Sequence, residues 1–243
     1  MKNLLLSLTA ILVGISSSVN AETIILDASR DNTLYQDNFG NSNGAGDFLF
    51  TGQNGGSSPR RGLIAFDLSS IPQNATIDSV SFSLFVSQAN STPRDVSLHR
   101  VEADWGEGTS DAAGGEGGGT AATAGDATWD QSFFGTTSWV NEGGDFASTA
   151  SATASIGGSG SFYSWSSANL VADVQGWLDG SVNNFGWILI GDETEPSTSK
   201  RFNSRSNGSN TPALTIEFTA IPEPGFGLVL ASVFATCSIR RRR

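Results

Sequence analysis

The stretch Ser79-Val80-Ser81-Phe82-Ser83-Leu84-Phe85-Val86 decides the fold class of this chain. Val80, Phe82, Leu84 and Val86 fall on one side of an extended backbone, and the serines fall on the other. A strict period of two is typical of a β-strand that buries one face and exposes the other. Further strands must therefore cover the apolar side of this stretch.

Such strands are visible as short apolar patterns separated by turn residues. Val96 and Leu98 alternate with Ser97 and His99, and a last alternation falls at Leu214, Ile216 and Phe218. Leu63–Leu68 is almost continuously apolar, and Phe185–Ile190 is apolar on both faces, as in a central strand. Together these patterns predict an all-β fold.

One segment has the spacing of an α-helix instead. Its apolar positions recur three and four residues apart, at Leu170, Val174, Trp177 and Leu178. Ser166 or Ser167 can cap its start, and Gly180 can end it just after Asp179. We expect one short helix packed across an end of the β-domain.

Residues 106–145 differ from the rest of the domain because glycine is frequent and the run Gly114–Gly125 is of low complexity. Such a run cannot build a core, so we expect a long surface excursion. Tryptophans and carboxylates flank it on both sides.

The two ends of the chain read as targeting segments rather than as parts of the domain. Met1–Ala21 has a charged start, an apolar stretch and a small-residue cleavage site, which predicts a secretory signal peptide. Residues 22–220 are then long enough for one domain. The last segment, 221–243, has an extended Pro222-Glu223-Pro224, the uncharged run Phe226–Ile239 and four arginines.

The charge of the domain limits its partners. The whole chain has 13 Lys and Arg against 24 Asp and Glu. Without Lys2, Arg240–Arg243 and Glu223, 8 basic and 23 acidic residues remain, a net charge of −15. A surface of this sign repels nucleic acid and disfavours polyanionic glycans unless a local basic patch or a bridging cation exists. The single cysteine, Cys237, excludes a disulfide within the domain.

The order of parts in 221–243 resembles the PEP-CTERM sorting signal. The matching positions are Pro222, Glu223 and Pro224, then Phe226–Ile239, and then Arg240, Arg241, Arg242 and Arg243. The resemblance implies a Gram-negative bacterium, export across the inner membrane, and an exosortase that passes the protein to the cell surface, envelope or biofilm matrix. As a helix, Phe226–Ile239 spans about 21 Å, short of the roughly 30 Å hydrocarbon core. We therefore expect transient membrane association and removal of the tail, rather than a permanent anchor.

The domain itself resembles the DNRLRE-domain proteins. The motifs that carry the resemblance run in order through residues 24–218: Arg60–Pro72, Trp105–Gly108, Asp173–Leu178, Asn184–Trp187, Lys200–Arg205 and Pro212–Ile216. The family is similar to carbohydrate-binding modules of secreted polysaccharide-degrading enzymes, so the resemblance implies a jelly-roll-like β-sandwich and a polysaccharide ligand. Here the module stands without an enzyme domain. Within the motifs we expect Asp67 to cap a turn, and Arg61 and Arg201 to pair with carboxylates.

Tryptophans are the first candidates for a glycan site, because sugar rings stack on flat aromatic side chains. Trp129, Trp139 and Trp165 lie among Gly, Ser and Thr and are the candidate platforms, and covering the core is the alternative role. Trp177 and Trp187 lie in apolar periodic segments and are expected in the core, and packing is also expected for Trp105.

Calcium is the cofactor that suits this composition, because Asp, Asn and Gly loops offer oxygen ligands. The candidate ligands are Asp104, Glu107, Asp126 and Asp145, and the loop Asp37–Asp47 is a second acidic cluster without EF-hand spacing. Turn-forming and solvated roles are the favoured alternative for these residues.

Catalysis has little support in the sequence. His99 is the only histidine, and no serine carries a nucleophile signature. We therefore predict an exported, non-catalytic surface or matrix protein that binds extracellular polysaccharide. The alternatives are a purely structural matrix or envelope protein and, with less support, a polysaccharide hydrolase or lyase.

Overall fold

The computed structural model describes residues 20–221. The expected signal peptide up to residue 19 and the tail from Pro222 onward lie outside the described residues. Outside them also lie the sorting residues, Pro222, Glu223, Pro224 and Arg240–Arg243, and the run Phe226–Ile239.

The described chain is all-β with one helix, as the periodicity predicts. The first strands are β1 (Ala21–Tyr35), β2 (Asn41–Ser42), β3 (Phe48–Gln53), β4 (Pro59–Phe66), β5 (Thr76–Gln88) and β6 (Arg94–Arg100). The central strands are β7 (Thr120–Ala121), β8 (Gln131–Phe133), β9 (Thr137–Ser138), β10 (Ala152–Ile156) and β11 (Ser161–Trp165). Helix α1 (Ala168–Leu178) follows, and then β12 (Trp187–Ile190), β13 (Lys200–Asn203) and β14 (Ala213–Thr219).

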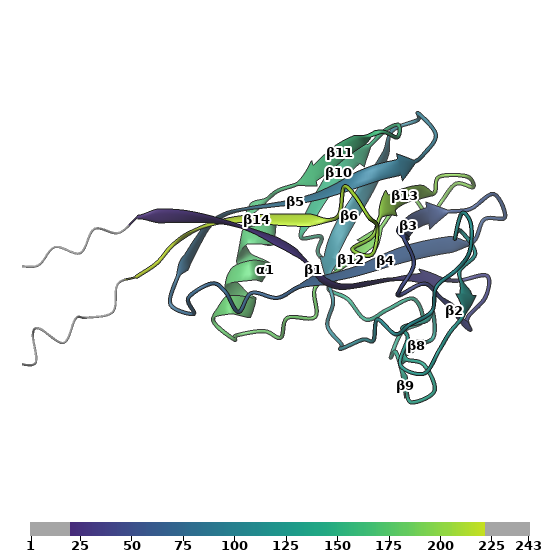
Figure 1. The fold of residues 1–243 in the computed structure, drawn as a ribbon, viewed down its shortest axis with the longest axis horizontal. Helices are drawn as coiled ribbons and strands as arrows, with labels where there is room; N and C mark the ends of the chain where they lie inside the picture. Colours follow the sequence, from purple (N-terminus) through teal and green to yellow (C-terminus); the bar gives the residue numbers. More distant parts are fainter. Residues whose placement is uncertain (1–19, 222–243) are drawn as a thin grey trace, which may run out of the picture.

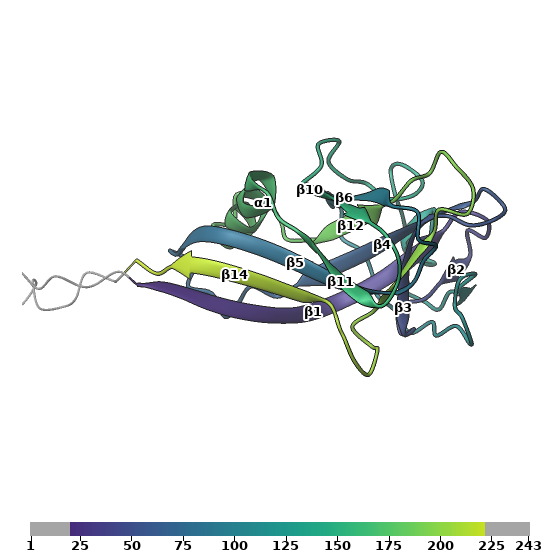
Figure 2. The same cartoon turned by 90° about the horizontal axis from the view of Figure 1, so that it is seen from above.

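The main sheet closes on itself. Its order is β1-β14-β5-β13-β3-β4, and β4 pairs back onto β1, so six strands form a small barrel (Figures 1 and 2). β1 makes this closure because its first half pairs with β14 and its second half with β4, with an irregularity between Ala28 and Arg30. This closed ring differs from the two separate sheets expected of a jelly roll.

Strands β12, β6 and β10 extend the sheet beyond β4, and β11 pairs with the free side of β5. β12 lies between β4 and β6, so Phe185–Ile190 does contain the expected central strand. The alternation in β5 is also confirmed, since Val80, Phe82, Leu84 and Val86 are buried.

The main core fills the space between the sheet and α1. Phe82 lies near its centre, with ring centroids 5.5 Å from Trp165 and 6.1 Å from Trp187. Helix α1 turns Leu170, Val174, Trp177 and Leu178 toward this core, and Figure 2 shows it over the long strands. Burial of several large aromatic rings supplies much of the stabilisation that a chain without disulfides needs.

The ends of α1 match the sequence prediction. The Ser167 side chain accepts a hydrogen bond from the Leu170 N–H, which satisfies one free donor of the first turn. Asp179 ends the helix, and Gly180 follows with a φ of 73°. The predicted turn at Asp67 is also confirmed, because its carboxylate accepts from the N–H and hydroxyl of Ser69.

The glycine-rich segment is more than a surface excursion. Most of Gly114–Gly125 is exposed, but the flanks of the run fold back against the outside of β1, β4 and β12. There they build a second apolar cluster: Leu34, Leu63, Ala65, Val101, Trp105, Ala127, Trp129, Trp139 and Ile188. Low local complexity therefore did not prevent the flanking tryptophans from forming a core of their own.

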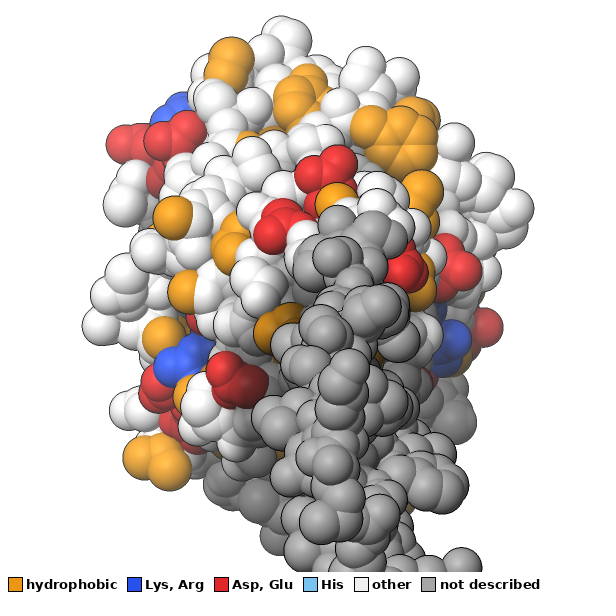
Figure 3. Space-filling view, turned by 90° about the vertical axis from the view of Figure 1, so that its left-hand side faces the viewer, with side chains coloured by type: hydrophobic (Ala, Val, Ile, Leu, Met, Phe, Trp, Pro, Cys, Tyr) orange, Lys and Arg blue, Asp and Glu red, His pale blue; other side chains and the backbone are white. Residues whose placement is uncertain are grey.

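The two ends of the described chain lie side by side, since Ala21 pairs with Thr219. Seen from that end, acidic side chains and small separate apolar spots are spread over a mainly polar surface (Figure 3). Strands β3 and β13 lie toward the opposite end of the molecule (Figure 1). No helix within residues 20–221 has the length and apolar character needed to cross a membrane.

Candidate functional site

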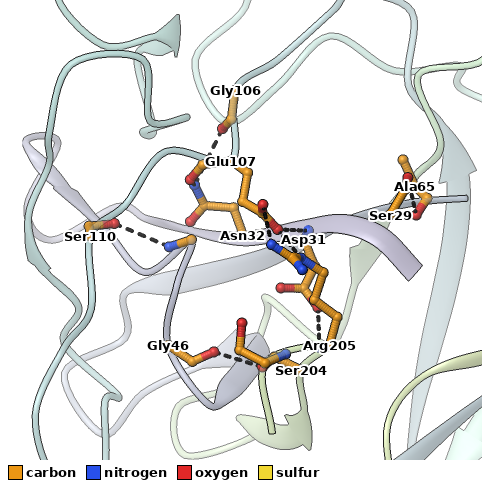
Figure 4. Close-up of polar contacts among 12 residues, drawn as sticks. Ser29, Asp31, Asn32, Gly46, Ala65, Gly106, Glu107, Ser110, Ser204 and Arg205 are labelled. Carbon is orange, nitrogen blue, oxygen red and sulfur yellow. Dashed lines mark hydrogen bonds and ion pairs between the residues drawn. The ribbon is translucent and has the colours of Figure 1, made fainter. Parts of the chain in front are cut away.

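A polar cluster joins β1 to the glycine-rich segment and to the loop after β13 (Figure 4). Glu107 accepts hydrogen bonds from the backbone N–H of Asp31, at 2.8 Å, and from two nitrogens of the Arg205 guanidinium. The backbone N–H of Arg205 in turn donates to Asp31 Oδ2 at 2.7 Å. Two carboxylates and one guanidinium are thereby held together from segments far apart in the sequence.

Asp31 is the unusual member of this cluster. Its side chain is fully buried, and within residues 20–221 its Oδ1 has no hydrogen-bond partner. Burial, and less so the charge of Glu107, raises the pKa of Asp31 to about 7, against lowering by Arg205. Because Asp31 has no exposed surface, no substrate can reach it, and the cluster acts as a structural tie rather than as an acid–base pair.

Asn32, the next residue of β1, anchors the same region. Its Oδ1 accepts from the Ser42 hydroxyl at 2.9 Å and from the Asn43 N–H at 3.0 Å, while its Nδ2 donates to the Glu107 carbonyl at 2.9 Å. A buried amide with these partners fixes how the glycine-rich segment crosses β1.

The four carboxylates predicted as calcium ligands each have another partner. Asp104 pairs with Arg30, and Glu107 with Arg205. Asp126 accepts from the Thr123 N–H, and Asp145 caps the turn at Val140 and Asn141. No group of three or more metal-ligating side chains gathers within residues 20–221. The structure thus does not bring Asp104, Glu107, Asp126 and Asp145 together.

The three candidate tryptophans do not form a platform. Trp165 belongs to the main core, and Trp129 and Trp139 belong to the second cluster, with exposed fractions of 0%, 4% and 6%. A sugar cannot stack on rings buried to this extent, so the platform expectation is corrected. Trp105, Trp177 and Trp187 are buried as expected.

The basic side chains single out one residue. Six arginines of residues 20–221 are ion-paired: Arg30, Arg60, Arg61, Arg94, Arg100 and Arg205. Lys200 is buried among oxygen acceptors. Arg201 is the one arginine without an ion pair in this part of the chain. The expected pairing is therefore confirmed for Arg61, which binds Glu193, and not for Arg201.

Arg201 is nevertheless held in place. Its guanidinium carbon lies 3.8 Å from the centroid of the Phe48 ring, and its Nε donates to the Ser87 hydroxyl at 3.1 Å. Stacking and one hydrogen bond fix the plane of the guanidinium, and its two terminal nitrogens have no hydrogen-bond partner within residues 20–221. A planar fork of donors is thus left for an acceptor from outside.

We call the hollow around this residue the Arg201 groove; its volume is about 440 Å³. It is lined by Phe50, Gln88, Ala89, Asn90, Gly115, Gly117, Ser197, Ser199 and Arg201. Glu116 lies near it and partly opposes the charge of Arg201. The Glu116 carboxylate is buried and accepts from Asn43 Nδ2 and from the N–H groups of Asp47 and Phe48, so it is already satisfied.

A second hollow, the Asp192 groove, lies over β6, β10 and the end of β12 and has a volume of about 710 Å³. Asp192 is held by Arg94 at 2.7 Å and by the N–H and hydroxyl of Thr194, and these hydrogen bonds from Thr194 lower its pKa. The acidic lining offers acceptors to a ligand rich in hydroxyl groups.

Among the described residues, His99 has a serine partner but no acid partner. Its Nε2 lies 3.0 Å from the Ser97 hydroxyl, and its Nδ1 lies 2.9 Å from the Ala147 carbonyl. A carbonyl can orient a neutral imidazole, but it cannot stabilise the imidazolium as the carboxylate of a triad does. The Ser97–His99 contact joins neighbours on one face of a strand, which needs no catalytic explanation.

Neither protein-family models nor curated proteins gave a match to this chain. Its function must therefore be argued from these residues. The sequence marked Arg201 only as a motif residue expected to pair with a carboxylate, and no local pattern could show that its charge lacks a partner.

Proposed function

We propose that this chain is an exported, non-catalytic surface or matrix protein that binds extracellular polysaccharide through the Arg201 groove. The observation that carries the proposal is the unpaired guanidinium of Arg201 in a polar hollow. In a domain with a net charge of −15, six of the seven arginines are ion-paired, so an oriented one without a partner suits an anionic ligand group.

The chemistry of the groove favours an acidic sugar. A guanidinium fork matches a carboxylate in two parallel hydrogen bonds, while amide and hydroxyl groups such as those of Gln88 and Ser199 suit sugar hydroxyls. The local positive charge also answers the objection that a strongly acidic domain repels polyanionic glycans.

The test compares polygalacturonate with its methyl-esterified form, which has the same backbone without free carboxylates. We expect Arg201→Gln to weaken binding of polygalacturonate about tenfold or more, because a charge-assisted hydrogen bond contributes roughly 1.5–3 kcal/mol. Arg100→Gln removes the same charge from another part of the surface and should bind as the wild type does.

Two outcomes would contradict the proposal. If the wild type retains no polysaccharide, the purely structural alternative is favoured. If product is released from polysaccharide and a His99 or carboxylate variant abolishes it, the hydrolase or lyase alternative is favoured. No Asp or Glu lines the Arg201 groove, and two of the three acids that line the Asp192 groove, Asp192 and Glu193, are ion-paired, which supports the non-catalytic proposal.

The remaining parts of the proposal rest on resemblance. A relation to DNRLRE domains, with their jelly-roll-like sandwich, is proposed on the motifs quoted above. Sorting by an exosortase in a Gram-negative bacterium is proposed on residues 221–243. Calcium stays a prediction without a ligand set to support it.

A further inference from the structure

Lys200 is a buried ammonium surrounded by neutral oxygens. Its side chain is 1% exposed. Its Nζ donates to the Thr92 carbonyl at 3.0 Å, the Gly157 carbonyl at 3.2 Å, and the carbonyl and Oδ1 of Asn90 at 3.3 and 3.4 Å. Four oxygens around one positive centre form a cage of the kind that otherwise holds a cation.

No carboxylate of residues 20–221 contributes to this cage. A buried charge without a counter-ion is costly unless hydrogen bonds replace its hydration, and here all of the partners are amide or carbonyl oxygens. Burial, and then the charge of Arg94, lowers the pKa of Lys200 from its ordinary value. Such a buried charge can hold the segments around it in one geometry even where it adds little net stability.

The segments that Lys200 ties together border both grooves. Asn90 lines the Arg201 groove, and Pro93, three residues later, lines the Asp192 groove. On the other wall, Thr194 belongs to the Asp192 groove and Ser197 to the Arg201 groove. Three residues of chain span at most about 11 Å, so residues 89–93 form a wall shared by two neighbouring hollows.

We propose that Lys200 is a positioning residue whose ammonium, held in the four-oxygen cage, fixes the wall 89–93 in the shape that binds polysaccharide. This inference rests on the proposed function. Lys200 does not touch the ligand. Its covalently attached ammonium takes the place that a free cation would occupy, next to Arg201, which binds the ligand.

Chemical rescue tests the role of the charge. Lys200→Ala removes the atoms of a propylammonium ion, so we expect polygalacturonate affinity to fall about tenfold and the NMR amide signals of residues 89–92 to shift. Added propylammonium should restore both in a saturable way. Propan-1-ol has a similar shape without the charge and should restore neither; equal rescue by the alcohol would overturn the inference.

Two further variants separate positioning from general destabilisation. Lys200→Met fills the space with an apolar side chain and is expected to lose affinity without rescue, which keeps the test decisive if the alanine variant does not fold. Ile77→Ala destabilises the core eleven residues before Gln88 on β5, roughly 36 Å away, and should bind as the wild type does.

The two proposals fail in different ways. If the wild type binds polygalacturonate and folded Lys200→Met binds equally well, the role of Lys200 is refuted and the proposed function stands. If the wild type does not bind, the proposed function fails, while the amide signals of residues 89–92 in Lys200→Ala still show whether the cage holds the wall.

Discussion

At the scale of single residues, Asp31 shows that this domain buries a titratable group at a cost. Its unfolded-state pKa is 3.8, and its folded-state pKa is about 7. Between these values the folded protein binds more protons than the unfolded chain, so the free energy of unfolding falls as pH rises from about 4 to 7 and stays low above 7. The full effect is on the order of 4 kcal/mol.

Asp31→Asn should remove this penalty. The amide oxygen can still accept from the Arg205 N–H, and no charge is buried. We expect the free energy of unfolding of the variant to exceed that of the wild type by about 1–3 kcal/mol at pH 8.5, and this difference to disappear at pH 4.5. Urea unfolding at both pH values measures it. Asp27→Asn, at an exposed strand position, should change stability by less than about 0.5 kcal/mol. A wild type as stable as Asp31→Asn at pH 8.5 would contradict the burial argument.

The same scale shows what local sequence cannot reveal. Arg61 and Arg201 both lie in strands near acidic residues, yet Arg61 binds Glu193, 132 positions away, and Arg201 binds no acid within residues 20–221. Trp129 and Trp139 have polar neighbours in sequence, but in the fold they belong to the same buried cluster as Leu63 of β4 and Ile188 of β12. These contacts depend on topology, and no pattern along the chain specifies it.

At the scale of elements, the sequence predicted those strands and helix ends that depend on interactions between residues close together in the chain. The alternation of β5, the apolar run of β12 and the caps of α1 all follow from hydrophobic periodicity and hydrogen bonds within a few residues. The closure of the sheet was not predicted. It depends on β1 pairing with β14 in one half and β4 in the other, and both halves have the same extended pattern in sequence.

Two glycines with similar backbone conformation offer a test of how closely β4 and β12 pack. Gly180 has a φ of 73°, and a Cβ there would meet no atom within 4 Å. Gly186 has a φ of 78°, but its Cβ would lie 2.1 Å from the Ile64 carbonyl oxygen. Gly180→Ala should therefore lower the free energy of unfolding by about 1 kcal/mol, from backbone strain alone. Gly186→Ala should lower it several times more, because β12 must also move away from β4.

Thermal or urea unfolding of the two variants measures this difference. Equal losses would mean that β12 shifts freely against β4 at Gly186. That result would contradict the tight pairing of Trp187 with Ile64 and Arg100.

At the scale of the whole molecule, the ends of the described chain, residues 20 and 221, lie at one end of the domain, which fits a protein that is processed there and binds at the other end. Ala21 and Thr219 are paired neighbours, while the strands that carry Arg201 and Phe48, β13 and β3, lie toward the opposite end. Processing or attachment at the ends therefore leaves the Arg201 groove accessible.

This arrangement limits where the tail can be cut. β14 pairs with β1 and β5 up to Thr219, and Asn74 Nδ2 donates to the Ile221 carbonyl at 2.9 Å. A processing enzyme needs an extended backbone with free hydrogen-bonding groups, so residues up to 221 are protected once the domain has folded. We predict that exported protein ends after Ile221 and lacks Phe226–Arg243, with the new C-terminus within residues 222–225. Mass spectrometry of surface-exported protein measures that end. An intact Arg243 would refute processing altogether, and an end before Ile221 would mean that cutting precedes the pairing of β14.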